Sequence, residues 1–126
     1  MLTGTYRDFF RRIKTTIPAD RIITDPLRTI AYGTDASFYR LIPKIVVTVE
    51  NEFEVQRILR EAGKLGLPVT FRAAGTSLSG QAITDSILVR MGTGWNGYRV
   101  FDQANKIRLQ PGIIGGHANR LLAAFD

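Results

Sequence analysis

The sequence predicts an α+β fold, close to the α/β type, with a small parallel or mixed sheet that contains a βαβ unit and is flanked by helices. Three features support this prediction. Ile45–Val49 is a β-branched run typical of a buried strand, residues 55–65 carry apolar side chains at helical spacing, and Val69–Phe71 forms a second short strand. This order predicts two parallel strands joined by a right-handed crossover.

Residues 1–30 are expected to form a helical lead-in to residues 31–126, which contain the βαβ unit. Five apolar residues recur in the lead-in at helical spacing, with basic residues between them: Tyr6, Phe9, Phe10, Ile13 and Ile17. We expect this helix to pack its aromatic face on the domain, and a position flat on a membrane surface is the alternative. Pro18 and Pro26 then bracket a short connection, for which a turn of helix and extended chain are the two expectations.

The central helix has clear start and stop signals. Asn51 is a good N-cap, and Glu54 follows three residues later, which is a capping-box arrangement. Gly66 stops the helix, and Pro68 follows at the usual distance. The next strand therefore begins directly after Pro68.

The stretch Phe71–Ala82, FRAAGTSLSGQA, is the strongest candidate for a binding loop. Its glycines can adopt positive φ, and its hydroxyl and N–H groups can direct several donors into one concavity, which suits a phosphate or pyrophosphate. Neither G-x-G-x-x-G nor G-x-x-x-x-G-K-[ST] is present, and a solvated turn has the same composition. The loop follows the second strand of a βαβ unit, where open α/β sheets bind ligands. With this position, a phosphate-binding loop and a solvated turn are equally well supported.

Three further elements are expected after this loop. Ile87, Leu88 and Val89 indicate a third buried strand within residues 86–91. Tyr98–Asp102 and Lys106–Gln110 predict a hairpin, and residues 117–126 have helical spacing. No stop signal follows this helix, so we expect the natural protein to continue.

Composition and motifs exclude several classes of site. The 126 residues, 44% of them apolar, suffice for one domain with an ordinary core. Without cysteine, disulfides and zinc–thiolate sites are excluded, and with His117 as the single histidine no metal site is expected. Seventeen Lys and Arg against eleven Asp and Glu give +6, but the basic residues are scattered, so no nucleic-acid partner is expected. No apolar window is long enough for a spanning helix, so we expect a soluble, cytoplasmic protein.

Taken together, these motifs resemble a known family. The order IPKIVVTVENEFEVQRILREAGKLGLPVTFRAAGTSLSGQAITDSILVRM resembles the start of the FAD-binding domain of the vanillyl-alcohol oxidase/p-cresol methylhydroxylase type. YGTDASFYRLIP and LQPGIIGGHANRLL are similar to bacterial FAD-linked dehydrogenases of the D-lactate dehydrogenase and glycolate oxidase group. The resemblance runs from about Tyr32 to the end. It implies that residues 1–126 are the N-terminal part of such a domain, its first subdomain, with the remainder of the protein absent.

The resemblance also implies the site residues. In the family this loop holds the FAD pyrophosphate, which assigns cofactor binding to Arg72, Ala73, Ala74, Gly75, Thr76, Ser77, Leu78, Ser79, Gly80 and Gln81. The turn Gln110–Gly112 is expected near the cofactor. Some relatives attach the flavin through a histidine in this loop, whereas positions 73 and 74 are alanine here, so non-covalent FAD is implied.

The function implied is part of an FAD-dependent oxidoreductase that oxidises a 2-hydroxy acid such as D-lactate or glycolate. The family's catalytic and substrate-binding residues lie in later regions, so this segment alone is expected to be inactive. An electron acceptor and a peripheral contact with the inner membrane are left open as partners. The alternatives are a non-catalytic basic module that binds nucleic acid or an acidic partner, and another flavoenzyme of the same fold, such as a reductase of cell-wall precursor synthesis.

Overall fold

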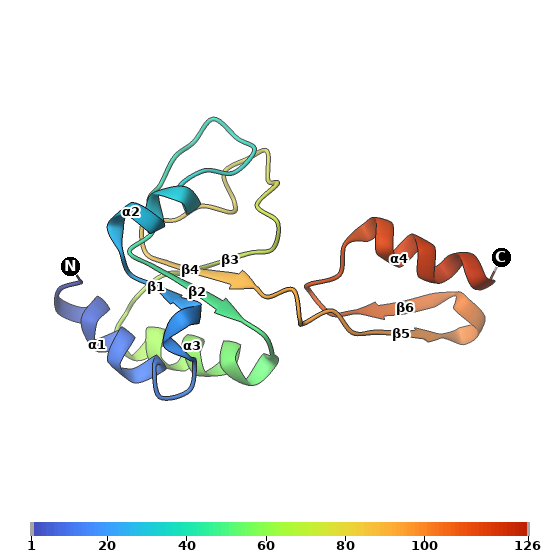
Figure 1. The fold of residues 1–126 in the computed structure, drawn as a ribbon, viewed down its shortest axis with the longest axis horizontal. Helices are drawn as coiled ribbons and strands as arrows, with labels where there is room; N and C mark the ends of the chain where they lie inside the picture. Colours follow the sequence, from blue (N-terminus) through green and yellow to red (C-terminus); the bar gives the residue numbers. More distant parts are fainter. Residues whose placement is uncertain (1, 126) are drawn as a thin grey trace.

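The computed structural model describes residues 2–125 as a layered main body with a smaller lobe beside it (Figure 1). The α-helices are α1 (Gly4–Ile13), α2 (Pro26–Thr29), α3 (Glu52–Lys64) and α4 (Gly115–Leu122). The strands are β1 (Ile22–Ile23), β2 (Ile45–Val49), β3 (Val69–Arg72), β4 (Ile87–Met91), β5 (Tyr98–Phe101) and β6 (Lys106–Leu109). Short 3-10 turns lie at Ala19–Arg21, Ile30–Tyr32, Asp102–Ala104 and Ala123–Phe125.

The main body is built on a mixed sheet with strand order β1-β2-β4-β3. Strands β2, β4 and β3 are parallel, and β1 is an antiparallel edge strand. The predicted βαβ unit, β2–α3–β3, is present, but β4 lies between its two strands. The predicted mixed α/β architecture with a small sheet is therefore confirmed, and the lead-in contributes a strand as well as helices.

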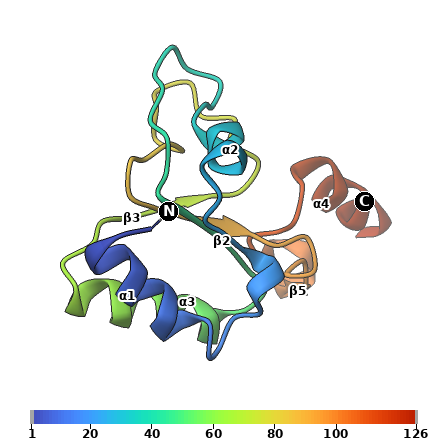
Figure 2. The same cartoon turned by 60° about the vertical axis from the view of Figure 1, so that its left-hand side comes forward.

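Helices α1 and α3 lie side by side on one face of the sheet (Figures 1 and 2). Because side chains alternate along a strand, Ile45, Val47 and Val49 of β2 all point into this layer, where they are fully buried. Phe9 and Ile13 of α1 are in the same core, which confirms that the aromatic face packs on the domain. The helix ends at Ile13, before the predicted Ile17.

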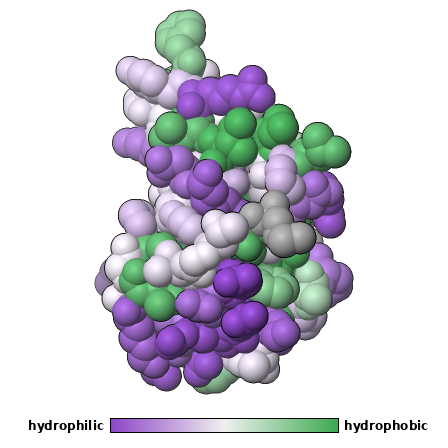
Figure 3. Space-filling view, turned by 90° about the vertical axis from the view of Figure 1, so that its left-hand side faces the viewer, coloured by the Kyte–Doolittle hydropathy of each residue, from purple (hydrophilic) through white to green (hydrophobic). Residues whose placement is uncertain are grey.

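The opposite face of the sheet is covered by α2 and by two long loops, residues 33–44 and 73–86, at the top of Figure 1. Val46, Leu88 and Ile23 form a small second core there, with Tyr32 packed on it. Figure 3 shows apolar side chains gathered on the upper part of one side of the molecule. The exposed large apolar residues of α2 and the loop after it are Leu27, Ile30, Phe38, Tyr39, Leu41 and Ile42.

The smaller lobe consists of the antiparallel β5–β6 hairpin and α4 (Figure 1). The predicted hairpin is confirmed, and its connection holds Asp102, Gln103 and Ala104 at positive φ. Helix α4 begins at Gly115, two residues before the predicted start. Within residues 2–125, no helix combines the length and the apolar character needed to cross a bilayer.

The start of α3 is fixed by polar contacts. Asn51 Oδ1 accepts the N–H of Glu54 at 3.0 Å, as an N-cap should. The Glu54 carboxylate accepts two hydrogen bonds from Arg21, at 2.8 and 2.6 Å, and one from the N–H of Glu50 at 2.9 Å. The reciprocal bond of a capping box would come from the Asn51 N–H, so Glu54 reaches one residue further back. Burial raises the pKa of Glu54, but these hydrogen bonds outweigh it and hold the pKa below its ordinary value.

Glu54→Ala should lower the free energy of unfolding at neutral pH by about 3 kcal/mol, because Arg21 would lose its partner in a largely buried position. Since the pKa of Glu54 is depressed in the folded state, this stabilisation is present above its ordinary pKa of 4.5 and is lost as the pH falls below that value. Urea unfolding followed by circular dichroism would measure both effects. Gln56→Ala, on the exposed surface of the same helix, is the control and should change stability by less than about 0.5 kcal/mol. Equal stability of the two variants at neutral pH would contradict this account.

Candidate functional site

The candidate site begins where β3 ends. Arg72 is the last residue of β3, and residues 73–86 connect the carboxyl end of this strand to β4. Gly75 and Gly80 adopt φ of 74° and 75°, a region that side chains with a Cβ rarely adopt. The predicted placement of the loop at the carboxyl edge of a parallel sheet is therefore confirmed.

The loop is organised internally by Ser77. Its Oγ accepts the N–H groups of Ser79 at 3.2 Å and Gln81 at 3.3 Å, and it donates to Gln81 Oε1 at 3.1 Å. Within residues 2–125, the N–H groups of Gly75, Thr76, Ser77 and Leu78 make no hydrogen bond to the protein. Four successive donors thus remain available to water or to an anion.

Arg72 places a positive charge at the base of this loop. Its Nη1 donates to the carbonyls of Tyr32 at 3.2 Å and Thr34 at 3.1 Å. The guanidinium lies against Gly75, where an added Cβ would collide with it. The positive φ therefore favours glycine at position 75, and a larger residue there would also displace the Arg72 guanidinium.

A cavity of about 360 Å³ adjoins the first residues of the loop. It is lined by Ala73 and Ala74, by Arg90, Met91, Gly92 and Thr93 at the end of β4, and by Pro111, Gly112, Ile113, Ile114 and Gly115. The structure therefore brings the start of the predicted loop together with part of the predicted Gln110–Gly112 turn. The Gln110 side chain turns away, because its Oε1 accepts the N–H of Gly97 at 2.6 Å.

Of the predicted residues, Arg72 and Gly75 to Gln81 do not line this cavity. They form the rest of the loop beside it, where Leu78 is 79% exposed. Sequence reasoning missed Arg90, which does line the cavity and pairs with Arg72 in the β3–β4 register. Arg90 could have been found from its position at the end of the third predicted strand, beside the end of the strand that leads into the loop.

The carboxylate of Glu50 lies against the glycine that lines one wall of this cavity. Glu50 follows β2, and its carboxylate packs against Gly92 and Gly94, so that a Cβ at Gly92 would collide with it. Its Oε2 is buried without a hydrogen-bond partner. Among residues 2–125, no three His, Cys, Asp or Glu residues are grouped closely enough to hold a metal ion.

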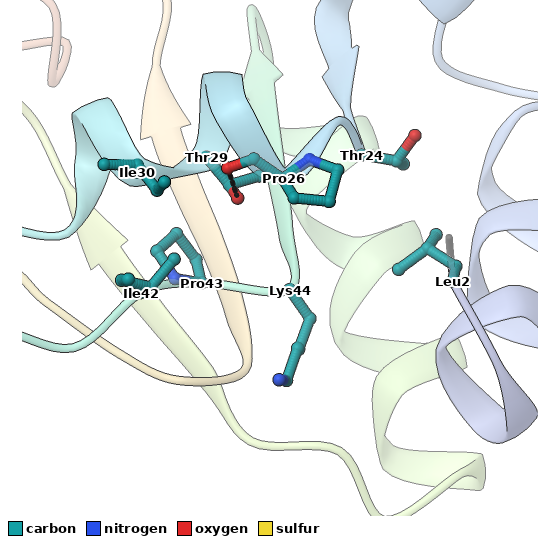
Figure 4. Close-up of a pocket in the computed structure, with 8 residues that line it drawn as sticks. All are labelled: Leu2, Thr24, Pro26, Thr29, Ile30, Ile42, Pro43 and Lys44. Carbon is teal, nitrogen blue, oxygen red and sulfur yellow. Dashed lines mark hydrogen bonds between the residues drawn. The ribbon is translucent and has the colours of Figure 1, made fainter.

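A second cavity of about 360 Å³ lies at the opposite end of β2 (Figure 4). Its lining is Leu2, Thr24, Pro26, Thr29, Ile30, Ile42, Pro43 and Lys44. The hydrogen bond drawn in Figure 4 joins the Thr29 hydroxyl to the Pro26 carbonyl, 3.1 Å apart, and the Lys44 amine points away from both. Because this cavity lacks converging donors, the loop after β3 is the better candidate site.

Comparisons with known proteins identify the family of the chain. The FAD binding domain family matches residues 43–126. D-2-hydroxyglutarate dehydrogenase of Escherichia coli K12 is 30% identical over 102 residues, which are 76% of this chain and 10% of that protein. The enzyme of the same name from Pantoea ananatis is 28% identical over 100 residues. The chain thus spans about a tenth of the length of these relatives.

Solved structures show the same fold at low sequence identity. A substrate-bound structure of p-cresol methylhydroxylase matches with a TM-score of 0.79 and 12% identity, over 98% of this chain and 25% of that one. A structure of alkyldihydroxyacetonephosphate synthase matches with a TM-score of 0.77 and 19% identity, over 94% of this chain and 25% of that one. The predicted resemblance to flavoenzymes of the p-cresol methylhydroxylase type is confirmed, and the chain belongs to the FAD binding domain family.

Proposed function

We propose that the chain binds FAD non-covalently and that the loop from Arg72 to Gln81 holds its pyrophosphate. One observation carries the proposal: in a member of the FAD binding domain family, four successive N–H groups of this loop have no partner within the described residues. They follow the carboxyl end of a parallel strand, where open α/β sheets bind ligands.

The charges around the loop suit a pyrophosphate. Arg72 stands at its base, and Arg90 lies beside Arg72 in the strand register. Unpaired N–H groups on a loop with positive-φ glycines form a concave anion site, and charge-assisted hydrogen bonds are stronger than neutral ones. In this proposal Gly75, Thr76, Ser77 and Leu78 donate through their main-chain N–H groups, and the Ser77 hydroxyl keeps the loop in shape.

The adjoining cavity would receive the part of the cofactor next to the pyrophosphate. Its walls are mostly small or apolar, from Ala73 and Ala74 on one side to Pro111–Gly115 on the other. At Gly112, an added Cβ would lie 2.5 Å from the Trp95 carbonyl oxygen, so a larger residue would displace this wall. Such a lining suits flat, largely apolar groups.

The non-covalent form of the proposal rests on the side chains of the loop. Ala73 and Ala74 carry no nucleophile, and the single histidine, His117, lies exposed on α4. The chain supplies binding and orientation, and the chemistry supplied by bound FAD is hydride acceptance from the hydroxyl-bearing carbon of a substrate.

We further propose that the full-length protein oxidises a 2-hydroxy acid. The relatives named D-2-hydroxyglutarate dehydrogenase support this substrate class. D-Lactate and glycolate are the smaller candidates within it. The groups that bind and activate the substrate would come from outside residues 1–126, so this chain alone should show no activity.

The full-length protein should absorb in the visible region as a flavoprotein and should release its flavin on acid precipitation. Release is expected because residues 73–86 contain no histidine or cysteine to which the flavin could be attached. The measurement is the spectrum of the pellet and supernatant after precipitation. Flavin retained in the pellet would contradict non-covalent binding, and a protein that neither contains FAD nor binds added FAD would contradict the proposed function.

Gly75→Val should abolish FAD binding while most of the fold remains. The added side chain is strained at a φ of 74° and collides with Arg72. Gly63→Val is the control, because nothing lies within 4 Å of a Cβ at position 63. Fluorescence titration with FAD measures affinity, and circular dichroism measures the fold. Unaltered affinity in Gly75→Val would mean that the loop is a plain turn.

A further inference from the structure

The segment Tyr32–Leu41, the brace segment, forms a closed structure next to the loop after β3. Thr34 and Arg40 form an isolated antiparallel bridge, and the Leu41 N–H donates to the Gly33 carbonyl at 3.1 Å. Inside this closure, Asp35 Oδ1 accepts the Ser37 N–H at 2.8 Å. The brace segment is therefore held in shape by its own hydrogen bonds.

The brace segment contacts the predicted binding loop, residues 71–82, near both ends of the loop. At the start of the loop, Arg72 donates to the carbonyls of Tyr32 and Thr34. At its end, Asp35 Oδ2 accepts the N–H of Ala82 at 3.4 Å. In Figures 1 and 2 the loop before β2 and the loop after β3 lie side by side on the same face of the sheet.

A third contact lies between these two. The ring of Tyr39 packs against Gly80, where an added Cβ would lie 2.8 Å from the Tyr39 Cδ2 atom. Gly80 is one of the two positive-φ glycines of the loop. The brace segment thus touches the start, the second glycine and the end of the loop.

Asp35 joins the two segments through a single carboxylate. Its Oδ1 atom holds the brace segment closed, and its Oδ2 atom holds the loop. The hydrogen bonding from Ser37 holds the pKa of Asp35 below its ordinary value, and the Ala82 N–H and the positive charge of Arg72 act in the same direction. Asp35 is therefore ionised at neutral pH, which strengthens both hydrogen bonds.

We propose that Asp35 is a positioning residue for the cofactor, which acts through the brace segment to hold the pyrophosphate loop in its binding conformation. This inference rests on the proposed function of that loop. Ordering an exposed loop on binding lowers affinity, and a loop that is already held in shape avoids this loss. The brace segment would supply that preorganisation.

The test uses three variants of the apoprotein. Asp35→Ala removes both hydrogen bonds. Asp35→Asn keeps one oxygen for the Ser37 N–H, but its amide NH₂ cannot accept from Ala82. Asp25→Ala is the matched control, because Asp25 makes the same kind of contact, accepting the Leu27 N–H at 3.0 Å, at the start of α2 and away from the loop.

Hydrogen exchange followed by mass spectrometry is the first measurement. Peptides covering residues 73–82 should exchange faster in Asp35→Ala and Asp35→Asn, while β2 and β4 remain protected. Asp25→Ala should leave the loop unchanged. Unchanged exchange of residues 73–82 in both Asp35 variants would overturn the proposal. If Asp35→Ala also loses protection in β2 and β4, its fold is disturbed, and the exchange of residues 73–82 in Asp35→Asn then decides whether the proposal holds.

FAD affinity is the second measurement. Both Asp35 variants should bind FAD about tenfold more weakly, because part of the binding free energy would then be spent on ordering the loop. Faster loop exchange with FAD affinity within about twofold of the wild type would overturn the positioning role. If the wild type binds no FAD, the proposed function fails, and the positioning role fails with it. Hydrogen exchange then reports only whether Asp35 holds the loop.

Discussion

The parallel pairing of β4 between β2 and β3 is the constraint on which the rest of the structure depends. It buries Ile87, Leu88 and Val89 completely and aligns the carboxyl ends of three strands at one edge. Arg72 stands opposite Arg90 in this register, and Met91 stands opposite Val49. The binding loop, the end of β4 and the turn at 111–115 therefore meet around a single cavity.

Charge and backbone conformation then determine what this edge can bind. Two arginines side by side would repel each other, and hydrogen bonds to the carbonyls of Tyr32 and Thr34 compensate Arg72 in part. An anion between the arginines and the unpaired N–H groups of the loop would complete the compensation. This is the physical reason why a member of the FAD binding domain family would keep these groups exposed.

Much of the fold could be predicted because its signals are local. The β-branched run at Ile45–Val49, the N-cap at Asn51 and the two strands of the β5–β6 hairpin depend on neighbouring residues, and the structure confirms them. Strand order could not be predicted, because periodicity does not identify a strand's partner. The edge strand β1 was predicted only as a helical turn or extended chain, since Ile22–Ile23 is too short to show a pattern.

The candidate site, like the fold, could be predicted from the sequence only in part. The glycine loop and its place after β3 follow from local sequence, whereas the role of residues 72–81 in holding FAD stays a prediction. Arg90 and the brace segment were missed because they depend on distant contacts. Arg72 meets the carbonyls of residues 40 and 38 positions away, and Asp35 meets an N–H group 47 positions away.

A crystal structure of the full-length protein with FAD would test the central claim most directly. The account predicts that pyrophosphate oxygens lie about 3 Å from the main-chain nitrogens of Gly75, Thr76, Ser77 or Leu78. It also predicts that part of the cofactor fills the cavity between Ala73 and Gly112. A pyrophosphate bound at another edge of the sheet, with these N–H groups facing water, would contradict the account.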